Sequence, residues 1–431
     1  MTRFLSLIAA VLIAACASNK SETKTAPAEN ADVSIREFEA ILFLHKHNTK
    51  EQELIYEQEI EKYTEAIRLD PNNSLTYVKR GLSYFLTGKF DKARDDFDRA
   101  IQLNPNDTYA NISCGLMHCL KSKYDLAITC FNKAIQLESN NIIAYIGRGL
   151  TYYANKDFNK AISDYNQALR LDSKNIWAYK GRGDVYFKKE DYDLAIADFN
   201  QALLLDPNDA EAYFNRGLAY HEKKDYERAI ADYTEVVRID PNDATAYINR
   251  GIAYGYKGDY DSAIIDHTNA LRLDPNNAQT YYNRGIPYYK KGELDLAIAD
   301  YTQAITLDPK LDMAYNNRGW AYKDKGEFDL AISDCTQAII INPKYANAYD
   351  SRGTAYAEKG ELDLAISDFN EAIALNPNYT VAYTSRGNAY FKKGDYNSAI
   401  ADFEAALRID PNHTNAKLGL ERAKAARQPV Q

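Results

Sequence analysis

The sequence of 431 residues lacks the short motifs that common classes of enzyme need for catalysis. It has no glycine-rich phosphate-binding loop, no zinc-protease helix and no nucleophile elbow. Its glycine residues instead recur at regular places in a repeated unit, where chain conformation explains them. We therefore predict that the protein is not an enzyme and that it requires no cofactor.

A basic surface is also missing. The chain carries 52 Lys and Arg residues against 61 Asp and Glu residues, for a formal net charge of -9, and has no basic stripe. Proteins that bind nucleic acid need clustered positive charge to neutralise phosphates. The composition therefore predicts that nucleic acid is not a partner.

An apolar run near the start of the chain is too short to span a membrane stably. Arg3 precedes this run, which covers residues 4–13 and is followed by small residues. A basic residue, a short apolar run and small residues are together typical of a secretory signal peptide. We therefore assign residues 1–15 to a signal peptide.

The last residues of this segment and the residue after it are Ile13, Ala14, Ala15 and Cys16. They resemble a bacterial lipobox, in which the cysteine is acylated and becomes the first residue of the mature protein. The resemblance implies that Cys16 is the lipid attachment site, and that the protein is held at the bacterial cell membrane or outer membrane, facing the periplasm or the cell exterior. Several acyl chains would anchor it stably, because each buried methylene contributes about 0.8 kcal/mol. Ordinary secretory cleavage after Ala15 is the alternative.

A unit of 34 residues recurs ten times from Asn72 to Pro411 without insertion or deletion, which is the signature of a repeat architecture. In the sixth unit, residues 244–257 and 260–273 have the apolar spacing of helices. Gly258 lies where the first helix should end. A hairpin of two helices cannot bury both of its apolar faces, so the units must stack in a row with a continuous core.

Five places in the unit carry a distinctive set of residues, which in one repeat are Gly217, Tyr220, Ala229, Tyr233 and Pro241. This pattern resembles the tetratricopeptide repeat. The resemblance implies an all-α fold, a right-handed superhelical solenoid of antiparallel helical hairpins with ten full repeats plus caps. It also implies protein binding in a groove lined by the first helices. Together with the lipobox, it identifies the chain as a bacterial tetratricopeptide repeat lipoprotein.

The remaining segments flank the repeats. The polar composition of residues 16–34 predicts a flexible tether after the lipidated cysteine. Residues 35–71 are predicted to form an N-terminal helical cap with a degenerate repeat, before the ten repeats of residues 72–411. Residues 412–431 are predicted to form a C-terminal capping helix and tail, which a solenoid needs in order to stay soluble.

Two charged places in the repeat are lost together. Arg occupies the seventh place in nine repeats, and Asp occupies the twenty-third place in the same nine. In the second repeat these places hold Cys114 and Cys130. Joint loss indicates that Arg and Asp pair within each repeat, because a partly buried Arg without its carboxylate would be destabilising. The alternative is that both places are solvated and the second repeat has drifted.

The second repeat also has His118 where the other repeats have Tyr, four residues after Cys114 on the same helix face. Contact between Cys114 and Cys130 would permit a disulfide in an exported protein. A metal site with His118 is another alternative, although it lacks a fourth ligand unless Cys119 turns inward. Reduced core thiols are the third. We retain Cys114 and Cys130 as a possible disulfide and assign no metal ligand.

The second, fifth, ninth and twelfth places of the first helices should line the groove. They are apolar in the first three repeats and mixed in later ones. An exposed apolar surface of this length usually marks a ligand or partner site, although the apolar helix near residues 38–44 could instead fill it. The predicted partner-binding residues are Leu75, Val78, Leu82, Tyr109, Ile112, Leu116, Ile143, Ile146, Trp177, Phe214, Tyr282 and Trp320.

These features predict a membrane-anchored protein–protein interaction scaffold of the bacterial cell envelope. Proteins or peptides of the envelope are the expected partners, and the sequence names neither them nor the oligomeric state. The alternative is a carrier or sensor that binds a small apolar ligand or a metal, either in the groove or at the cysteine-rich second repeat.

Overall fold

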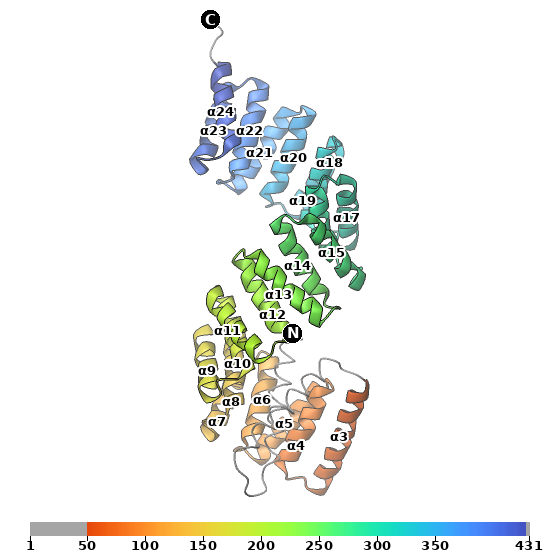
Figure 1. Ribbon diagram of the computed structural model, residues 1–431, viewed down its shortest axis with the longest axis vertical. Coiled ribbons are helices and arrows are strands. Elements are labelled where there is room, and N and C mark those ends of the chain that lie inside the picture. Colours follow the sequence, from red (N-terminus) through yellow and green to blue (C-terminus); the bar gives the residue numbers. More distant parts are fainter. Residues whose placement is uncertain (1–49, 428–431) are drawn as a thin grey trace. The chain divides into compact units, whose positions relative to one another are not determined.

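The computed structural model of the protein describes residues 50–427, which form 22 helices and no strand (Figure 1). They fall into two compact units, one ending at Asp225 and the other beginning at Tyr226. The helices of the first unit are α3 (Lys50–Leu69), α4 (Ser74–Leu86), α5 (Phe90–Leu103), α6 (Thr108–Leu120), α7 (Tyr124–Leu137), α8 (Ile142–Ala154), α9 (Phe158–Leu171), α10 (Ile176–Lys188), α11 (Tyr192–Leu205) and α12 (Ala210–Glu222). Those of the second unit are α13 (Tyr226–Ile239), α14 (Ala244–Lys257), α15 (Tyr260–Leu273), α16 (Ala278–Lys290), α17 (Leu294–Leu307), α18 (Asp312–Asp324), α19 (Phe328–Ile341), α20 (Ala346–Lys359), α21 (Leu362–Leu375), α22 (Thr380–Lys393), α23 (Tyr396–Ile409) and α24 (Thr414–Arg427).

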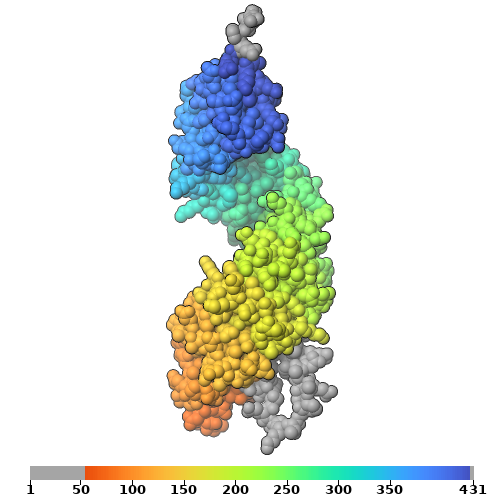
Figure 2. All heavy atoms as spheres, turned by 90° about the vertical axis from the view of Figure 1, so that its left-hand side faces the viewer, coloured from red at the N-terminus to blue at the C-terminus, as the bar shows by residue number. Residues whose placement is uncertain are grey.

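Consecutive helices pack as hairpins within each unit. In the first unit α4 packs with α5, α6 with α7, α8 with α9 and α10 with α11. In the second unit the hairpins run from α14 with α15 to α22 with α23, and α24 packs on α23. Within each unit, neighbouring hairpins lie against one another in sequence order (Figure 2). The all-α solenoid of hairpins predicted from the sequence is therefore confirmed, and α14 and α15 have the predicted bounds.

Short polar residues start many of the first helices. The side chain of Asn73 accepts a hydrogen bond from the backbone N–H of Thr76, and Asp107 accepts from the N–H groups of Tyr109 and Ala110. Each cap satisfies donors that the first turn of a helix leaves without an intrahelical partner. The turn residues between repeats therefore also fix where the next helix begins.

The turn inside each hairpin needs a residue in the left-handed conformation. Gly258, the predicted end of α14, has a φ of +86°. In four repeats of the first unit the same place is held by a residue with a side chain, at φ values between 56° and 64°. These residues are Ser122, Lys156, Glu190 and Lys224. The hairpin packing holds them in a conformation that residues other than glycine adopt infrequently.

Glycine at the eighth place allows the two helices of a hairpin to approach closely. A Cβ atom on Gly353 would lie 2.8 Å from Cε1 of Phe369 and 3.1 Å from the backbone oxygen of Ala365. Phe369 is itself only 1% exposed. The small residue and the aromatic ring therefore form the core contact of the hairpin, because a larger side chain would push the helices apart.

Several predicted segments lie outside the described residues. These are the signal peptide of residues 1–15, Cys16 with its tether, and the part of the N-terminal cap before residue 50. The described end segments are helical: α3 lies within the predicted leading repeat, and α24 lies within the predicted closing segment. Between residues 50 and 427, no helix combines the length and the apolar character needed to cross a membrane.

Candidate partner-binding groove and its supporting network

The seventh and twenty-third places form a two-pronged ion pair in eight repeats. In each, the Arg donates from Nε and Nη2 to the two carboxylate oxygens of the Asp, at distances of 2.6 to 2.8 Å. The pair between Arg284 and Asp300 is typical, with side chains 18% and 8% exposed. The predicted pairing is therefore confirmed in these repeats, and each pair joins the two helices of a hairpin.

Tyrosine rings cover the guanidinium groups. The Cζ atom of Arg284 lies 5.6 Å from the ring centre of Tyr281 and 5.9 Å from that of Tyr288. These rings occupy the fourth and eleventh places of the repeat. A cation over an aromatic face is attracted by the ring quadrupole, so the rings shield the ion pair from water and also stabilise the charge.

The guanidinium groups also contact the preceding repeat, which the sequence analysis missed. Arg148 donates through Nη1 to Oδ1 of Asn132 at 2.5 Å, and Arg284 donates to Oγ1 of Thr268 at 3.0 Å. The acceptor is always at the twenty-fifth place of the preceding repeat, where the recurrence of Asn or Thr was the available signal. These acceptors are Thr64, Asn132, Asn166, Asn200, Thr234, Thr268, Thr302, Thr336 and Asn370. Each Arg in these contacts therefore also fixes the position of its repeat against the preceding one.

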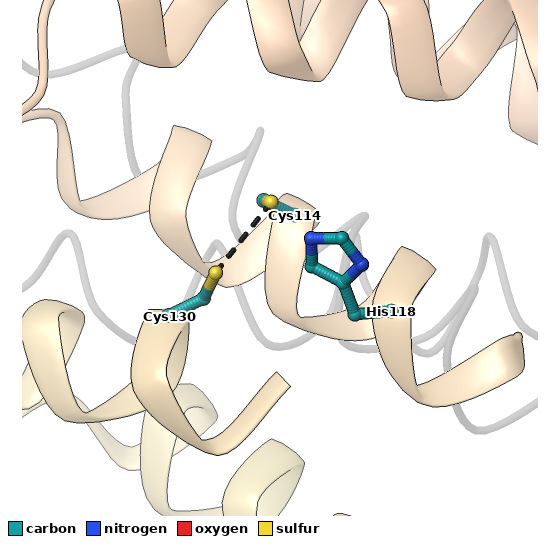
Figure 3. A group of neighbouring side chains, drawn as sticks. All are labelled: Cys114, His118 and Cys130. Carbon is teal, nitrogen blue, oxygen red and sulfur yellow. Dashed lines mark hydrogen bonds between the residues drawn. The ribbon is translucent and has the colours of Figure 1, made fainter. Parts of the chain in front are cut away.

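The second repeat has a thiol pair in place of the ion pair. The sulfur atoms of Cys114 on α6 and Cys130 on α7 lie 3.5 Å apart and share a hydrogen bond, and both thiols are free (Figure 3). This hydrogen bond, with burial, raises the pKa of Cys114, whereas it lowers the pKa of Cys130. Burial lowers the pKa of the neighbouring His118. The predicted contact between the two cysteines is confirmed, and the disulfide stays a prediction.

Half of the predicted groove residues are buried, which corrects the expectation of an exposed apolar wall. Six of the twelve are at most 5% exposed. They are Val78, Leu82, Ile112, Leu116, Ile146 and Phe214. The first five of these belong to one hydrophobic cluster that also holds the rings of Phe97 and Phe131, and α6 packs on both α4 and α8. The sequence pattern did not predict how deeply these six side chains are buried, so partner contact through them would require a different conformation.

Three fifth-place residues of the second unit are also buried, and all three are polar. Asn316, Asp350 and Thr384 are 4%, 2% and 5% exposed. The carboxyl group of Asp350 is held by Tyr379 and Ser385, and its burial raises its pKa to about 6. Its Oδ1 atom has no hydrogen-bond partner among the described residues. The fifth place of α18 and of α20 therefore contains a buried polar atom without a hydrogen-bond partner among the described residues.

The other six predicted groove residues are partly exposed. These are Leu75, Tyr109, Ile143, Trp177, Tyr282 and Trp320. Trp177 lies beside Lys180, whose Nζ atom is 4.8 Å from the ring centre and forms ion pairs with Asp209 at 2.8 Å and Glu211 at 2.7 Å. Burial alone would lower the pKa of Lys180, but these two carboxylates raise it above its usual value. The ammonium group of Lys180 therefore forms ion pairs with carboxylates of the protein itself.

The richest partly exposed network lies on α16 and α18. The Nδ2 atom of Asn317 donates to the hydroxyl oxygen of Tyr282 at 3.2 Å, and the hydroxyl of Tyr289 donates to Asp324 at 2.5 Å. Lys323 precedes Asp324 in the chain, and its Nζ atom lies 2.6 Å from the other carboxylate oxygen of Asp324. The same Nζ atom lies 4.1 Å from the ring centre of Trp320. Adjacent first helices therefore present aromatic rings whose positions are fixed by hydrogen bonds and charge.

The fold defines a helical-repeat solenoid, and family models give its class a name. Two models described as "Tetratricopeptide repeat" and one described as "TPR repeat" match segments spread over most of the chain. The first two match residues 181–244 and residues 74–107, 244–277, 313–345 and 380–413, and the third matches residues 115–156, 149–189, 287–326 and 353–394. The chain belongs to the tetratricopeptide repeat family. Such solenoids are generally non-enzymatic scaffolds that bind proteins or peptides.

Solved structures with similar folds include the Cut9–Hcn1 hetero-tetramer of the APC/C, with 17% identity, a TM-score of 0.48, and coverage of 88% of this chain and 95% of that chain. Yeast Tom70 has 17% identity, a TM-score of 0.46, and coverage of 91% and 96%. MamA has 31% identity and a TM-score of 0.36, and the match covers 39% of this chain and 92% of that one. No curated protein matches the chain.

Proposed function

We propose that the protein is a lipid-anchored scaffold of the bacterial cell envelope that docks segments of partner proteins on its first helices. The observation that carries this proposal is the ordered aromatic network of Tyr282, Tyr289 and Trp320. Aromatic residues dominate the binding energy of protein interfaces, since they bury large areas with few rotatable bonds. These three rings are partly exposed and already held in place by neighbouring side chains.

An extended partner segment suits this face. The sixth place of successive first helices holds Asn249, Asn283 and Asn317, all partly exposed. A side-chain amide offers both a donor and an acceptor, so it can bind the backbone of an extended chain whatever its sequence. The rings would then select the side chains of that segment. Other proteins that bind extended peptides also obtain affinity from hydrogen bonds to the peptide backbone and specificity from pockets for its side chains.

The Arg–Asp ion pairs, together with the contacts of each Arg to the preceding repeat, support partner docking by holding the helices in fixed positions. Arg318, for example, joins α18 to α19 through Asp334 and reaches back to Thr302 of the preceding repeat. Binding orders both partners, and a surface that is already ordered loses less conformational freedom. The repeated ion pairs would therefore support binding by keeping the first helices in fixed positions.

The lipid anchor at Cys16 can be tested separately from the groove. Cys16→Ala is expected to leave the repeats folded while the protein is released from membranes or accumulates as an unprocessed precursor, because no acyl chain can be attached. Membrane fractionation with intact-mass measurement checks this, with Cys335→Ala, a change at a buried core thiol, as the matched control. Normal processing and unchanged membrane association of the Cys16 variant would rule out the anchor.

A further inference from the structure

We propose that Cys114, His118 and Cys130 bind a zinc ion within the second repeat. One sulfur or nitrogen atom from each residue lies within 4.8 Å of the other two (Figure 3). Cys114 and His118 are four residues apart and project from the same face of α6, while Cys130 reaches them from α7. Two thiolates and one imidazole are ligands that zinc commonly uses.

The separation of the sulfur atoms suits a tetrahedral ion. With zinc–sulfur bonds of about 2.3 Å, two thiolates of a tetrahedral site lie about 3.8 Å apart, whereas a linear site would separate them by about 4.6 Å. The observed separation of 3.5 Å is close to the tetrahedral value. On binding, Zn²⁺ would displace one proton from each thiol to solvent, so that the two negative charges of the thiolates balance the metal charge in this largely buried place.

The fold itself brings these three places together. In other repeats the same places hold an Arg, a Tyr and an Asp, and the Arg and Asp meet at hydrogen-bond distance, as Arg148 and Asp164 do at 2.7 Å. The positions of α6 and α7 therefore need no special rearrangement to converge on an ion. The second repeat has exchanged a charge pair and its covering ring for three metal-ligating groups, all at contacting places.

A fourth place has changed in the same neighbourhood. The twenty-fifth place of the preceding repeat, where an Asn or Thr otherwise accepts from the Arg, holds Asp98 before this repeat. Beside the larger influences of burial and the thiol–thiol hydrogen bond, the carboxylate of Asp98 acts on the pKa of Cys114, His118 and Cys130 alike. Asp98 is not one of the residues whose ligand atoms lie within 4.8 Å of one another, so we assign it a supporting role, in which its carboxylate accepts a hydrogen bond from the free ring nitrogen of His118 and orients the ring.

Cys119 provides the contrast within the same helix. It is 2% exposed and lies outside the ligand group. It was the fourth ligand considered from sequence alone, and its sulfur does not lie with the ligand atoms of the other three residues. Cys119 and the distant Cys335 therefore serve as thiol controls, because neither belongs to the site.

The test is a titration of the reduced, metal-free full chain with Co²⁺, which reports tetrahedral thiolate coordination by its visible absorption. We expect one equivalent of Co²⁺ to give tetrahedral d–d bands with sulfur-to-cobalt charge transfer, and Zn²⁺ to displace it and to raise the Tm. Asp98→Asn should weaken Zn²⁺ binding about 10- to 100-fold, the usual effect of removing a supporting group. Cys119→Ser and Cys335→Ser should bind like the unaltered protein.

The matched loss-of-site variant restores the pattern of the other repeats. Cys114→Arg combined with Cys130→Asp should fold, because it rebuilds the ion pair, and should bind neither metal. A tetrahedral spectrum that persists in this double variant would overturn the proposal, as would its absence from the reduced unaltered protein. Binding of Cu⁺ without Zn²⁺ or Co²⁺ would show that the zinc assignment is wrong. A disulfide between Cys114 and Cys130 whose reduction yields no metal uptake would likewise overturn it.

Discussion

Asp300→Ala is expected to lower the free energy of unfolding by about 2–4 kcal/mol. The change leaves the guanidinium of Arg284 without either of its carboxylate acceptors, which lie 2.8 Å from Nε and Nη2. The Arg side chain is only 18% exposed and lies between two tyrosine rings, so water restores little of what is lost. Denaturant unfolding followed by circular dichroism measures the difference.

Asp295→Ala is the matched control on the same helix. Asp295 also pairs with a cation at 2.8 Å, the Nζ atom of Lys325, but its side chain is 87% exposed. Exposed ion pairs contribute little because solvent and salt screen them, so this variant should unfold close to the unaltered protein. Similar losses in the two variants would mean that the seventh and twenty-third places are merely solvated.

Asp350→Asn is expected to raise stability at pH 7 by about 1–2 kcal/mol. Burial raises the pKa of Asp350 to about 6, above the value of 3.8 for an unperturbed carboxyl. The folded protein therefore holds this proton more tightly than the unfolded chain does. Its contribution to stability is present below about pH 4 and is lost as the pH rises through about 6, so at neutral pH the carboxylate is a buried charge that the Asn variant removes.

The pH dependence distinguishes this effect from a simple change of packing. Unfolding free energies measured from pH 4 to 7 should show the advantage of Asp350→Asn growing with pH, then levelling above the pKa of Asp350. Asp363→Asn, at a carboxylate that is 87% exposed, should leave the profile unchanged. An Asn variant that is less stable at pH 7 would show that Tyr379 and Ser385 compensate the charge fully.

The 34-residue period was sufficient to predict most of the fold. Ten copies of one pattern located the helices, and Gly258 marked the end of α14 because only a left-handed residue fits there. Comparison of the copies also revealed the Arg–Asp pair, since Cys114 and Cys130 replace both members together. Internal repetition thus supplied, from a single sequence, information about contacts that is usually obtained from homologues.

The burial of individual side chains and the contacts between repeats were harder to predict. Leu116 was expected to line an exposed groove, yet it is fully buried within one hydrophobic cluster. A hydrophobic period identifies the side of a helix but not how closely a neighbour approaches it. The link from Arg148 to Asn132 was missed for the same reason: the two residues belong to different repeats, and only the structure brings them together.

The most direct test of the scaffold is photo-crosslinking from a single groove residue in intact membranes. A photoreactive phenylalanine analogue at Trp320 is compared with the same analogue at Ile340, which is 65% exposed and lies on the second helix α19. Docking on the first helices predicts discrete protein adducts from residue 320 that disappear when Tyr289 is changed to Ala, and none from residue 340. No adduct from residue 320, or the same adducts from both places, would contradict partner binding in this groove.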